Sequence, residues 1–504
     1  MTTNITYCHQ PLATCPGVVL SRRATLGGML AMGVSFARAQ SPSQALTPYA
    51  QVWRATSRVG YGPTPNMTQA VLSSPSARDW ALQQIDQAFG ESNRVPVLGA
   101  DLWGLQLDLP QIFERFRTER EARKTAKNVS PANPPEPLAL DNKDPLHFSR
   151  AMAQQAAAWH LRACSQPELE NPLLARMTEF WFNHLNVFSG KGAVRPFVGH
   201  YLTQVIRRHA LGRFEDLVLA SARHPAMLAY LDQAQSVADG TPGREGKARG
   251  LNENYARELM ELHTLGVDGG YTQGDVRELA RVLTGWTVAP READGFRFAP
   301  RLHDHGTKQV LGRTFHDDGE QEGVAAIRML ARHPSTAQRI GLRLAKYFIS
   351  DNPPGATVHA IARSFQDTQG DMRAVLRTVF TSDAFWAPDQ TLFKTPMDFV
   401  CSALAATQGS SDNRLLVLSA GFLKNAGQPI HGWQTPDGYA FDAATWMVPE
   451  VLTRRADYAL ALARQADTNF LWPFLSAATR QTLEQERPAL RAGLILASPD
   501  FMAK

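Results

Sequence analysis

The stretch NENYARELMELHTLGVDGGYTQGDVRELARVLTGW, residues 252–286, indicates the fold class of this chain. Each residue turns an α-helix by about 100°, so residues three and four apart share a face. Two apolar faces with that spacing occur here, one in each half: Leu251, Tyr255, Leu259 and Leu262, then Val276, Leu279, Ala280 and Leu283. Three glycines between the two faces end the first helix: Gly266, Gly269 and Gly270. The stretch therefore predicts two helices joined by a turn.

Polar side chains crowd one edge of the first predicted helix. Asn252 is suited to cap it, and Glu253 suits the positive end of the helix dipole. Arg257 stands four residues from both Glu253 and Glu261, which favours ordinary ion pairs. Glu258 has no such partner and borders the apolar face. We therefore expect Glu258 to be partly buried with a raised pKa, as a general acid requires, and the alternative is a purely structural role.

The second helix of the hairpin has a recognisable start. Thr272 and Asp275 have the spacing of a capping box, so Asp275 is interpreted as a cap and not as a catalyst. His263 falls on the opposite side of the first helix from both Glu258 and Glu261. The hairpin therefore lacks the Glu-x-x-His spacing of di-iron bundles and the His-Glu-x-x-His spacing of zinc proteases.

The composition is that of a globular protein. The chain has 504 residues, of which 44% are hydrophobic and 20% charged, so it can bury a sizeable core. The formal net charge is +5, but Arg22, Arg23 and Arg38 precede residue 40 with no acidic residue among them. Later basic residues are scattered among acidic ones and form no block interleaved with aromatics. No nucleic acid partner is expected.

The first 39 residues resemble a twin-arginine export signal. SRRATLGGMLAMGVSFARAQ, residues 21–40, holds an arginine pair, a short apolar run and small residues at Ala37 and Ala39. These features are the n-region, h-region and A-x-A site of a signal peptide, and the run is too short to span a bilayer. We expect cleavage of residues 1–39, no transmembrane segment afterwards, and a periplasmic or secreted protein. The alternative is an ordinary N-terminal helix.

Beyond the leader, residues 40–504 are predicted to form one large, all-α domain with minor β content. Apolar residues recur mostly at helical spacing, with no clear alternation of period two. Helices are expected at 77–89 and 147–164. A Pro- and Asn-rich surface loop is expected at 127–145, and a Gly-rich loop at 238–250.

A further helix is expected at residues 335–350. Its apolar side carries Ile340 and Leu344, whereas Arg339, Arg343 and Lys346 form a basic stripe on another side. A basic stripe of this kind is most simply a face in contact with solvent.

Cysteine usage leaves two interpretations open. Cys8 and Cys15 fall in the predicted leader, which leaves Cys164 and Cys401 in the mature chain. Their separation in sequence is too great for a metal knuckle, so they form either a disulfide or two buried thiols. Twin-arginine export carries folded proteins, often with a cofactor, which favours a metal or cofactor without proving one.

Polar groups outside the hairpin supply further candidates. FWFNHLNVF, residues 180–188, sets Asn183 and His184 in an aromatic run, where a buried imidazole needs hydrogen-bond partners. Asp232 follows the apolar run AMLAYL, where a carboxylate opposes the helix dipole and needs a compensating cation. A loop candidate for metal chelation contains His303, Asp304, His305 and Lys308. No Gly-x-Ser-x-Gly and no phosphate-binding glycine loop occurs, which argues against a nucleophile elbow and against ATPase or classical dinucleotide chemistry.

The hairpin resembles the signature of the bacterial DUF1800 family almost residue for residue. Other segments resemble the same family in the same order: RATSRVGYGPTP (54–65), FWFNHLNVF (180–188), HPAMLAYLD (224–232), HDHGTKQVLGRTF (303–315), LARHPSTAQRIGLRLAKYFISDNPP (330–354), KTPMDFVCSALAA (394–406) and GWQTPDGY (432–439). The resemblance implies an exported, mainly α-helical protein and supplies no established reaction. It also implies an exported partner of the DUF1501 family, which looks sulfatase-like. His305 departs from the family pattern, so a joint role with His303 would be peculiar to this chain.

Two functions are compatible with these residues. The first is a hydrolase of envelope or extracellular polymer that uses carboxylates, a divalent metal ion, or both. Its catalytic candidates are Glu258, Glu261 and Asp232. Its substrate-binding candidates are Asn183, Asn254, Arg257, Trp286 and Lys308, and its metal-binding candidates are His184, His303 and Asp304. The second function is a non-catalytic periplasmic scaffold or binding protein that acts with a DUF1501-like partner. The hydrolase hypothesis requires Glu258 to share one pocket with at least two of His184, Asp232, His303 and Asp304.

Overall fold

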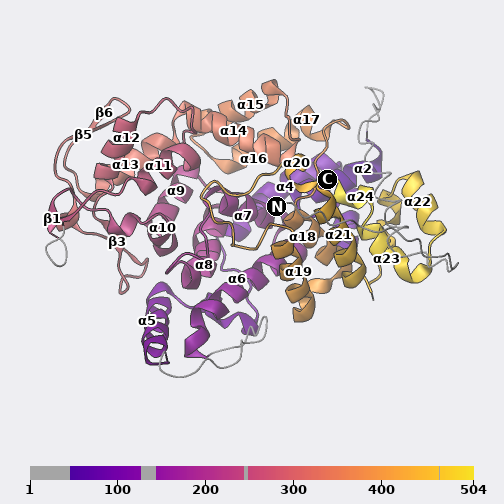
Figure 1. Ribbon diagram of the computed structural model, residues 1–504. Coiled ribbons are helices and arrows are strands. Elements are labelled where there is room, and N and C mark those ends of the chain that lie inside the picture. Colours follow the sequence, from indigo (N-terminus) through magenta and orange to yellow (C-terminus); the bar gives the residue numbers. More distant parts are fainter. Residues whose placement is uncertain (1–45, 127–143, 243–247, 465) are drawn as a thin grey trace, which may run out of the picture. The chain divides into compact units, whose positions relative to one another are not determined.

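Helices carry most of the regular structure (Figure 1). The computed structural model describes residues 46–126, 144–242, 248–464 and 466–504. Within these ranges the only sheets are three antiparallel pairs of short strands: β1 (Thr241–Pro242) with β2 (Ala248–Arg249), β3 (Trp286–Val288) with β4 (Phe296–Phe298), and β5 (Lys308–Val310) with β6 (Arg313–Phe315). The prediction of an all-α protein with minor β content is confirmed.

The helices described in the first half of the chain precede the hairpin. They are α2 (Pro48–Val59), α3 (Pro65–Ser73), α4 (Ala77–Ser92), α5 (Leu109–Ala126), α6 (Phe148–Ser165), α7 (Pro172–His184), α8 (Val198–His200), α9 (Phe214–Arg223) and α10 (Pro225–Tyr230). Several begin in the same way, with a capping side chain followed by proline in the first turn, as at Thr47, Thr64 and Asn171. The helices predicted at 77–89 and 147–164 correspond to α4 and α6.

The second half begins with the hairpin. Its helices are α11 (Asn254–Glu258), α12 (Gln273–Val282), α13 (Glu320–Ala331), α14 (Pro334–Phe348), α15 (Gly355–Asp367), α16 (Met372–Thr381), α17 (Asp383–Trp386), α18 (Pro396–Thr407), α19 (Asn413–Asn425), α20 (Ala443–Trp446), α21 (Pro449–Leu462), α22 (Ala477–Glu484), α23 (Pro488–Leu496) and α24 (Pro499–Met502). Thr272 and Asp275 form the predicted capping box of α12. The helix predicted at 335–350 is α14.

Short helical turns of other types connect these elements. The 3-10 turns are Ala100–Gln106, Pro145–His147, Arg195–Phe197, Gln233–Gln235, Pro300–Leu302, Gly409–Ser411 and Asn469–Phe474. Two segments are π-helical, namely Tyr201–Arg207 and Leu259–His263. The second continues α11, so the first helix of the hairpin widens after Glu258. A uniform turn of 100° per residue therefore misplaces the side chains that follow.

The core is centred on α7, in which every residue from Leu173 to His184 is buried. Its Trp181 is among the largest fully buried side chains, together with Trp159 of α6 and Trp286 of β3. A disulfide joins Cys164 of α6 to Cys401 of α18, which decides between the two interpretations of these cysteines. Contacts among the described residues join them into one helical domain.

Some predictions fall partly or wholly outside the described residues. The leader, residues 1–39, is one of them, and so is most of the surface loop expected at 127–145. The Gly-rich segment at 238–250 contains the short strands β1 and β2, which the sequence did not predict. None of the described helices combines the length and apolarity needed to cross a membrane.

Candidate functional site

The two asparagines of the hairpin motif bind backbone. Nδ2 of Asn252 donates to the carbonyl of Asp232 (3.4 Å), and Nδ2 of Asn254 donates to the carbonyl of Leu231 (3.2 Å). Oδ1 of Asn252 also accepts from the N–H of Asn254 (2.9 Å), which is the expected capping contact. These bonds fasten the start of α11 to the turn after α10. Asp232 has a φ of 57° in this turn, so the asparagines hold a left-handed residue in place.

Two of the three glutamates in the first helix of the hairpin have partners. Arg257 contacts Glu253 (3.2 Å) and Glu261 (3.7 Å), as their four-residue spacing predicted, and also donates to the side chain of Gln273 (2.9 Å). Glu261 additionally hydrogen bonds with Tyr271, and burial together with this bond raises the pKa of the tyrosine to about 12. Glu253 and Glu261 therefore help to join the two helices.

Glu258 is the carboxylate without a partner. Its side chain is half-buried and makes no hydrogen bond or ion pair with any residue that the structure describes. Burial raises its pKa, the carboxylates of Glu261 and Asp437 raise it further, and Arg257 opposes them. Tyr230 lies in the same environment, since burial and the charges of Glu258 and Asp437 raise its pKa as well. The expected partly buried acid is therefore present at this position.

Asp437 reaches this environment on the loop GWQTPDGY, residues 432–439. The end of α7 holds the loop. Oδ1 of Asn183 accepts from the N–H of Tyr439 (2.9 Å), and Nδ2 of Asn183 donates to the carbonyl of the same residue (3.0 Å). Asn186 donates to the carbonyls of Trp433 (3.1 Å) and Thr435 (2.8 Å). Asn183, predicted to bind substrate, is instead 2% exposed and positions the loop.

Asp437 is not among the site residues predicted from the sequence. Its carboxylate is exposed and accepts from the hydroxyl of Thr435 (2.6 Å) and from the indole N–H of Trp433 (3.3 Å). The available signal was the match of GWQTPDGY to the family, because this motif contains one carboxylate. Nothing in the spacing of residues indicated that this carboxylate would face α11.

His184 and Arg339 bind the end of the first hairpin helix. Nε2 of His184 donates to the carbonyl of His263 (2.9 Å), and Arg339 donates twice to the carbonyl of Leu262 (3.2 and 3.0 Å). The last carbonyls of a helix lack partners within it, so both side chains satisfy groups that would otherwise be unpaired. Burial lowers the pKa of His184, and Arg343 and Arg339 lower it further. A neutral, buried His184 in this position has a structural role.

The prediction that the basic stripe of α14 faces solvent is wrong for two of its three residues. Arg339 is half-buried against the hairpin. The guanidinium of Arg343 has two buried nitrogens with no partner among the described residues, and burial, then Arg339, lowers its pKa to about 10. Asp437 attracts this guanidinium. Only Lys346 is exposed. Arg339 faces inward because the hairpin helix presents its carbonyl end there.

His303 belongs to a different cluster, between β5 and α13. Its Nδ1 donates to the carbonyl of Thr284 (2.9 Å), which leaves Nε2 facing the ammonium of Lys308 (3.3 Å) and Oε1 of Glu322 (3.2 Å). Lys308 donates to both carboxylate oxygens of Glu322 (3.1 and 2.9 Å). The side chains of His303, Lys308 and Glu322 are all at most 1% exposed. Lys308, predicted to bind substrate, is therefore enclosed in the core.

A metal could be bound in this cluster only by a different set of residues from the predicted one. One ligand atom each from His303, Asp317 and Glu322 lies within 4.8 Å of the others, and a nitrogen with two carboxylates suits a divalent ion. However, the ammonium of Lys308 already supplies a cation to Glu322. Asp304 instead forms an ion pair with Arg281 (2.8 Å). The structure thus does not bring His184, His303 and Asp304 together.

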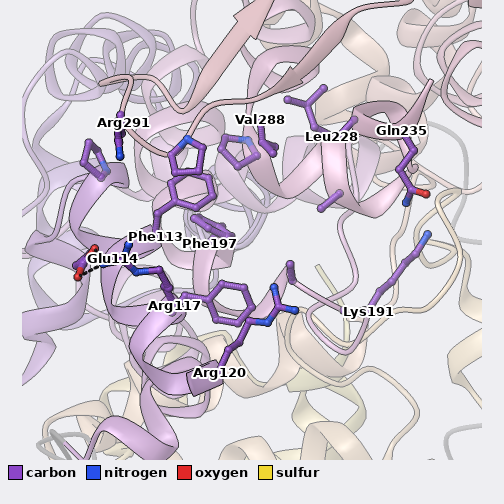
Figure 2. A pocket seen from close by; sticks show the side chains of 18 of the residues that line it. Phe113, Glu114, Arg117, Arg120, Lys191, Phe197, Leu228, Gln235, Val288 and Arg291 are labelled. Atoms are coloured by element: carbon purple, nitrogen blue, oxygen red, sulfur yellow. Dashed lines mark hydrogen bonds and ion pairs between the residues drawn. The ribbon is translucent and has the colours of Figure 1, made fainter. Parts of the chain in front are cut away.

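Asp232 is one of the residues that line a cavity of about 730 Å³. Figure 2 shows other residues of this lining, among them Lys191. Oδ2 of Asp232 accepts from Nζ of Lys191 (2.7 Å), and this ammonium is the compensating cation that the helix dipole argument required. Lys191 also donates to the carbonyl of Tyr230 (2.5 Å). The turn that carries Tyr230 and Asp232 therefore lies between the cavity and the environment of Glu258.

Trp286, the remaining binding candidate, is fully buried. Its ring stacks edge-on against Phe296, with the guanidinium of Arg223 5.6 Å from the ring centroid. A Cβ on Gly323 would lie 2.4 Å from the ring, which shows how closely α13 approaches it. Of the predicted site residues, Glu258, Glu261, Arg257 and Asn254 remain neighbours on the hairpin. The convergence of Glu258 with His184, Asp232, His303 and Asp304 in one pocket does not occur among the described cavities.

Comparison with known proteins gives a family and no function. No curated protein and no solved structure matches the chain. The family described as "Protein of unknown function (DUF1800)" matches residues 54–503, which include the hairpin, the loop that carries Asp437 and the cluster around His303. This match covers most of the chain, so the protein belongs to the DUF1800 family.

Proposed function

We propose that this protein is an exported hydrolase of extracellular or envelope polymer, in which Glu258 acts as general acid and Asp437 as second carboxylate. The pocket required by the sequence hypothesis, with Glu258 beside two of His184, Asp232, His303 and Asp304, is not among the described cavities, so Asp437 replaces those residues in the proposal. The observation that carries the proposal is the state of Glu258. It is half-buried, unpaired among the described residues, and close enough to Glu261 and Asp437 for both to raise its pKa. A raised pKa lets a carboxyl group keep its proton to a higher pH than usual, which favours donation of that proton to a leaving group.

Hydrolysis of a glycosidic bond fits this pair of carboxylates. The proton of Glu258 passes to the oxygen of the leaving sugar as its bond to the anomeric carbon breaks. A water molecule attacks that carbon and loses a proton to Asp437. Trp433 and Tyr439, on the same loop as Asp437, provide aromatic faces on which a sugar ring can pack.

Export is part of the proposal. The leader has the features of a twin-arginine signal, and the disulfide between Cys164 and Cys401 is typical of an oxidising compartment. Both features support a periplasmic or secreted location.

The alternative function is a non-catalytic binding protein that acts with an exported partner similar to the DUF1501 family. One observation favours it. The other polar groups of the motifs have structural partners, namely the asparagines of the hairpin, His184, and the ion pair of Lys308 with Glu322. Under this alternative Glu258 would be an interaction residue and not an acid. A metal-assisted hydrolase is less supported, because Lys308 lies where an ion at His303 would bind.

The test compares Glu258→Gln and Asp437→Asn with the wild-type protein on a panel of extracellular polysaccharides, with released reducing ends as the readout. Glu253→Gln is the matched control, since Glu253 is a partly exposed carboxylate of the same motif that already pairs with Arg257. We expect each of the first two variants to lose activity by about 100-fold or more at unchanged melting temperature. Wild-type activity should fall as pH rises through the raised pKa of Glu258.

Two results would decide against the hydrolase. The first is full activity of Glu258→Gln. The second is a wild-type protein that retains a polymer but releases no reducing ends, and this result would favour the binding alternative.

A further inference from the structure

The cavity at Asp232 has a lining that the proposed function does not use. Four segments form it: α5, the chain around the 3-10 turn Arg195–Phe197, α10 with the turn after it, and the end of β3 with the residues after it. Its volume of about 730 Å³ is within the usual range for a site that encloses a small molecule. Glu258 is not among its lining residues. The cavity is thus a second candidate site, separate from the carboxylates.

The floor of this cavity is apolar. The rings of Phe113 and Phe197 lie with their centroids 4.6 Å apart, and Phe116 packs edge-on against Phe197 at 6.3 Å. Leu228 and Val288 line the same space. Figure 2 shows Phe113 and Phe197 in the middle of the lining, with the labelled charged side chains around them. Such a floor favours an apolar ligand, because contact with it removes apolar surface from water.

The rim has an excess of positive charge. Its cations are Arg117, Arg120, Lys124, Lys191 and Arg291, and its acids are Glu114, Glu121 and Asp232. Two of the cations are neutralised, since Arg117 pairs with Glu114 (2.7 Å) and Lys191 with Asp232 (2.7 Å). The other three cations form no ion pair with the described residues, and Glu121 is the only acid left to oppose them. An anionic group is therefore favoured at this rim.

We propose that this cavity binds an anionic amphiphile, with one long alkyl chain on the aromatic floor and a carboxylate or phosphate at the cationic rim. A small anion would leave the floor uncovered, and a neutral chain would leave the unpaired cations unused. Both parts of the lining are satisfied by one molecule that carries both properties. Fatty acids and single-chain phospholipids share this chemistry. The proposal is independent of the hydrolase, because it involves none of the residues assigned to hydrolysis.

Isothermal titration of the mature protein, with probes kept below their micelle concentrations, tests the proposal. The anionic probes are dodecanoate and dodecyl phosphate, which separate a carboxylate from a phosphate headgroup. Dodecyl glucoside is the neutral probe, and inorganic phosphate and acetate are the anions without a chain. We expect one site for at least one anionic probe, and binding at least 10-fold weaker for dodecyl glucoside. Shortening the chain should weaken binding by up to about fourfold per methylene.

The variant Arg120→Gln/Lys124→Gln removes two of the unpaired cations. Both side chains are exposed, so the protein should keep its melting temperature, and affinity for the anionic probe should fall at least 10-fold. The matched control is Arg115→Gln. Arg115 is an exposed cation of the same helix that lies over Trp103, 5.1 Å from its ring centroid, outside the cavity lining. The control should bind the probe as the wild type does.

Each other outcome overturns the proposal. Equal affinity for dodecyl glucoside would show an apolar site with no charge preference. Equal affinity for inorganic phosphate or acetate would show a simple anion site. Absence of binding by both anionic probes, or loss of affinity in Arg115→Gln equal to that in the double variant, would exclude the cavity as the site. Loss of polysaccharide hydrolysis in Glu258→Gln would leave all of these results unchanged.

Discussion

Replacing Lys308 by methionine tests whether the cluster of His303, Lys308 and Glu322 is a structural ion pair or a metal site. Methionine keeps most of the length of the side chain and removes the charge. The lysine and glutamate side chains are 0% and 1% exposed, so Glu322 would be left as a buried carboxylate without its cation. It would keep hydrogen bonds only from His303 and from the N–H of Asp318 (3.1 Å). Removing one partner of a buried pair costs about 3–5 kcal/mol.

The corresponding fall in melting temperature is modest because the protein is large. An unfolding entropy of about 2.1 cal/mol/K per residue amounts to roughly 1 kcal/mol/K for the mature chain. The variant should therefore melt about 3–5 °C below the wild type at pH 7. Adding Glu322→Gln to Lys308→Met removes the buried charge and should restore most of the loss. Thermal unfolding followed by circular dichroism measures both effects.

The effect should depend on pH in a defined direction. Burial alone would raise the pKa of Glu322, but hydrogen bonds from His303 and Lys308 and the charge of Lys308 outweigh burial and lower it below the ordinary 4.5. A carboxylate with a lowered pKa stabilises the folded state above its unfolded pKa, and this stabilisation is lost as pH falls. In Lys308→Met the carboxylate can accept a proton to escape its unfavourable burial. The difference in melting temperature between wild type and variant should therefore be largest near neutral pH and shrink below about pH 4.

A melting temperature of Lys308→Met equal to that of the wild type at pH 7 would refute a structural ion pair between Lys308 and Glu322. A second refuting result would be stoichiometric metal in the wild-type protein, with two properties. Removal of the metal by a chelator would lower the melting temperature, and His303→Ala would no longer bind the metal. The second result would mean that an ion, and not Lys308, neutralises Glu322.

Three further predictions concern stability. The double variant Cys164→Ser/Cys401→Ser opens a loop of 237 residues and should melt roughly 4 °C lower, since a disulfide of this kind contributes about 4 kcal/mol. Alkylation of the unreduced wild-type protein should label neither of these cysteines. Gly438→Ala should destabilise the protein and reduce hydrolysis, because Gly438 has a φ of +72° and a new Cβ would lie 2.2 Å from a backbone oxygen of α7. The control Gly421→Ala, in an exposed and open part of α19, should stabilise the protein by about 0.5–1 kcal/mol in urea unfolding. Burial raises the pKa of Asp398, but the buried cations Arg176 and Lys504 outweigh burial and hold this pKa well below the ordinary 3.8. The contribution of Asp398 to stability is therefore present above about pH 4 and lost at lower pH. Asp398→Asn should be less stable at pH 7, and its melting temperature should fall less steeply as the pH is lowered.

Local spacing was enough to predict the hairpin and the helices at 77–89, 147–164 and 335–350, which correspond to α4, α6 and α14. The apolar repeat of residues 252–286 predicted the hairpin, and Thr272 with Asp275 predicted the capping box that starts α12. Helical faces and caps depend on residues within four positions of one another, so their physics is contained in a short piece of sequence. The same local argument identified Glu258 as the glutamate without a partner on its own helix. The family could be identified in the same way, since its motifs are continuous segments.

The partners of the polar residues were decided by the tertiary structure. Glu258 lies near Asp437 because Asn183 of α7 and Asn186, just after α7, hold a loop from the second half of the chain against it. Arg343 faces inward, although it belongs to the basic stripe of α14 that was predicted to face solvent. His303 faces Lys308 and Glu322 and not its neighbour in sequence, Asp304. The sequence by itself determined which side chains share a helix face, because that is set by the helix repeat. Only the packing of distant segments decided what each face meets, because burial and opposing charges come from residues that no local spacing relates.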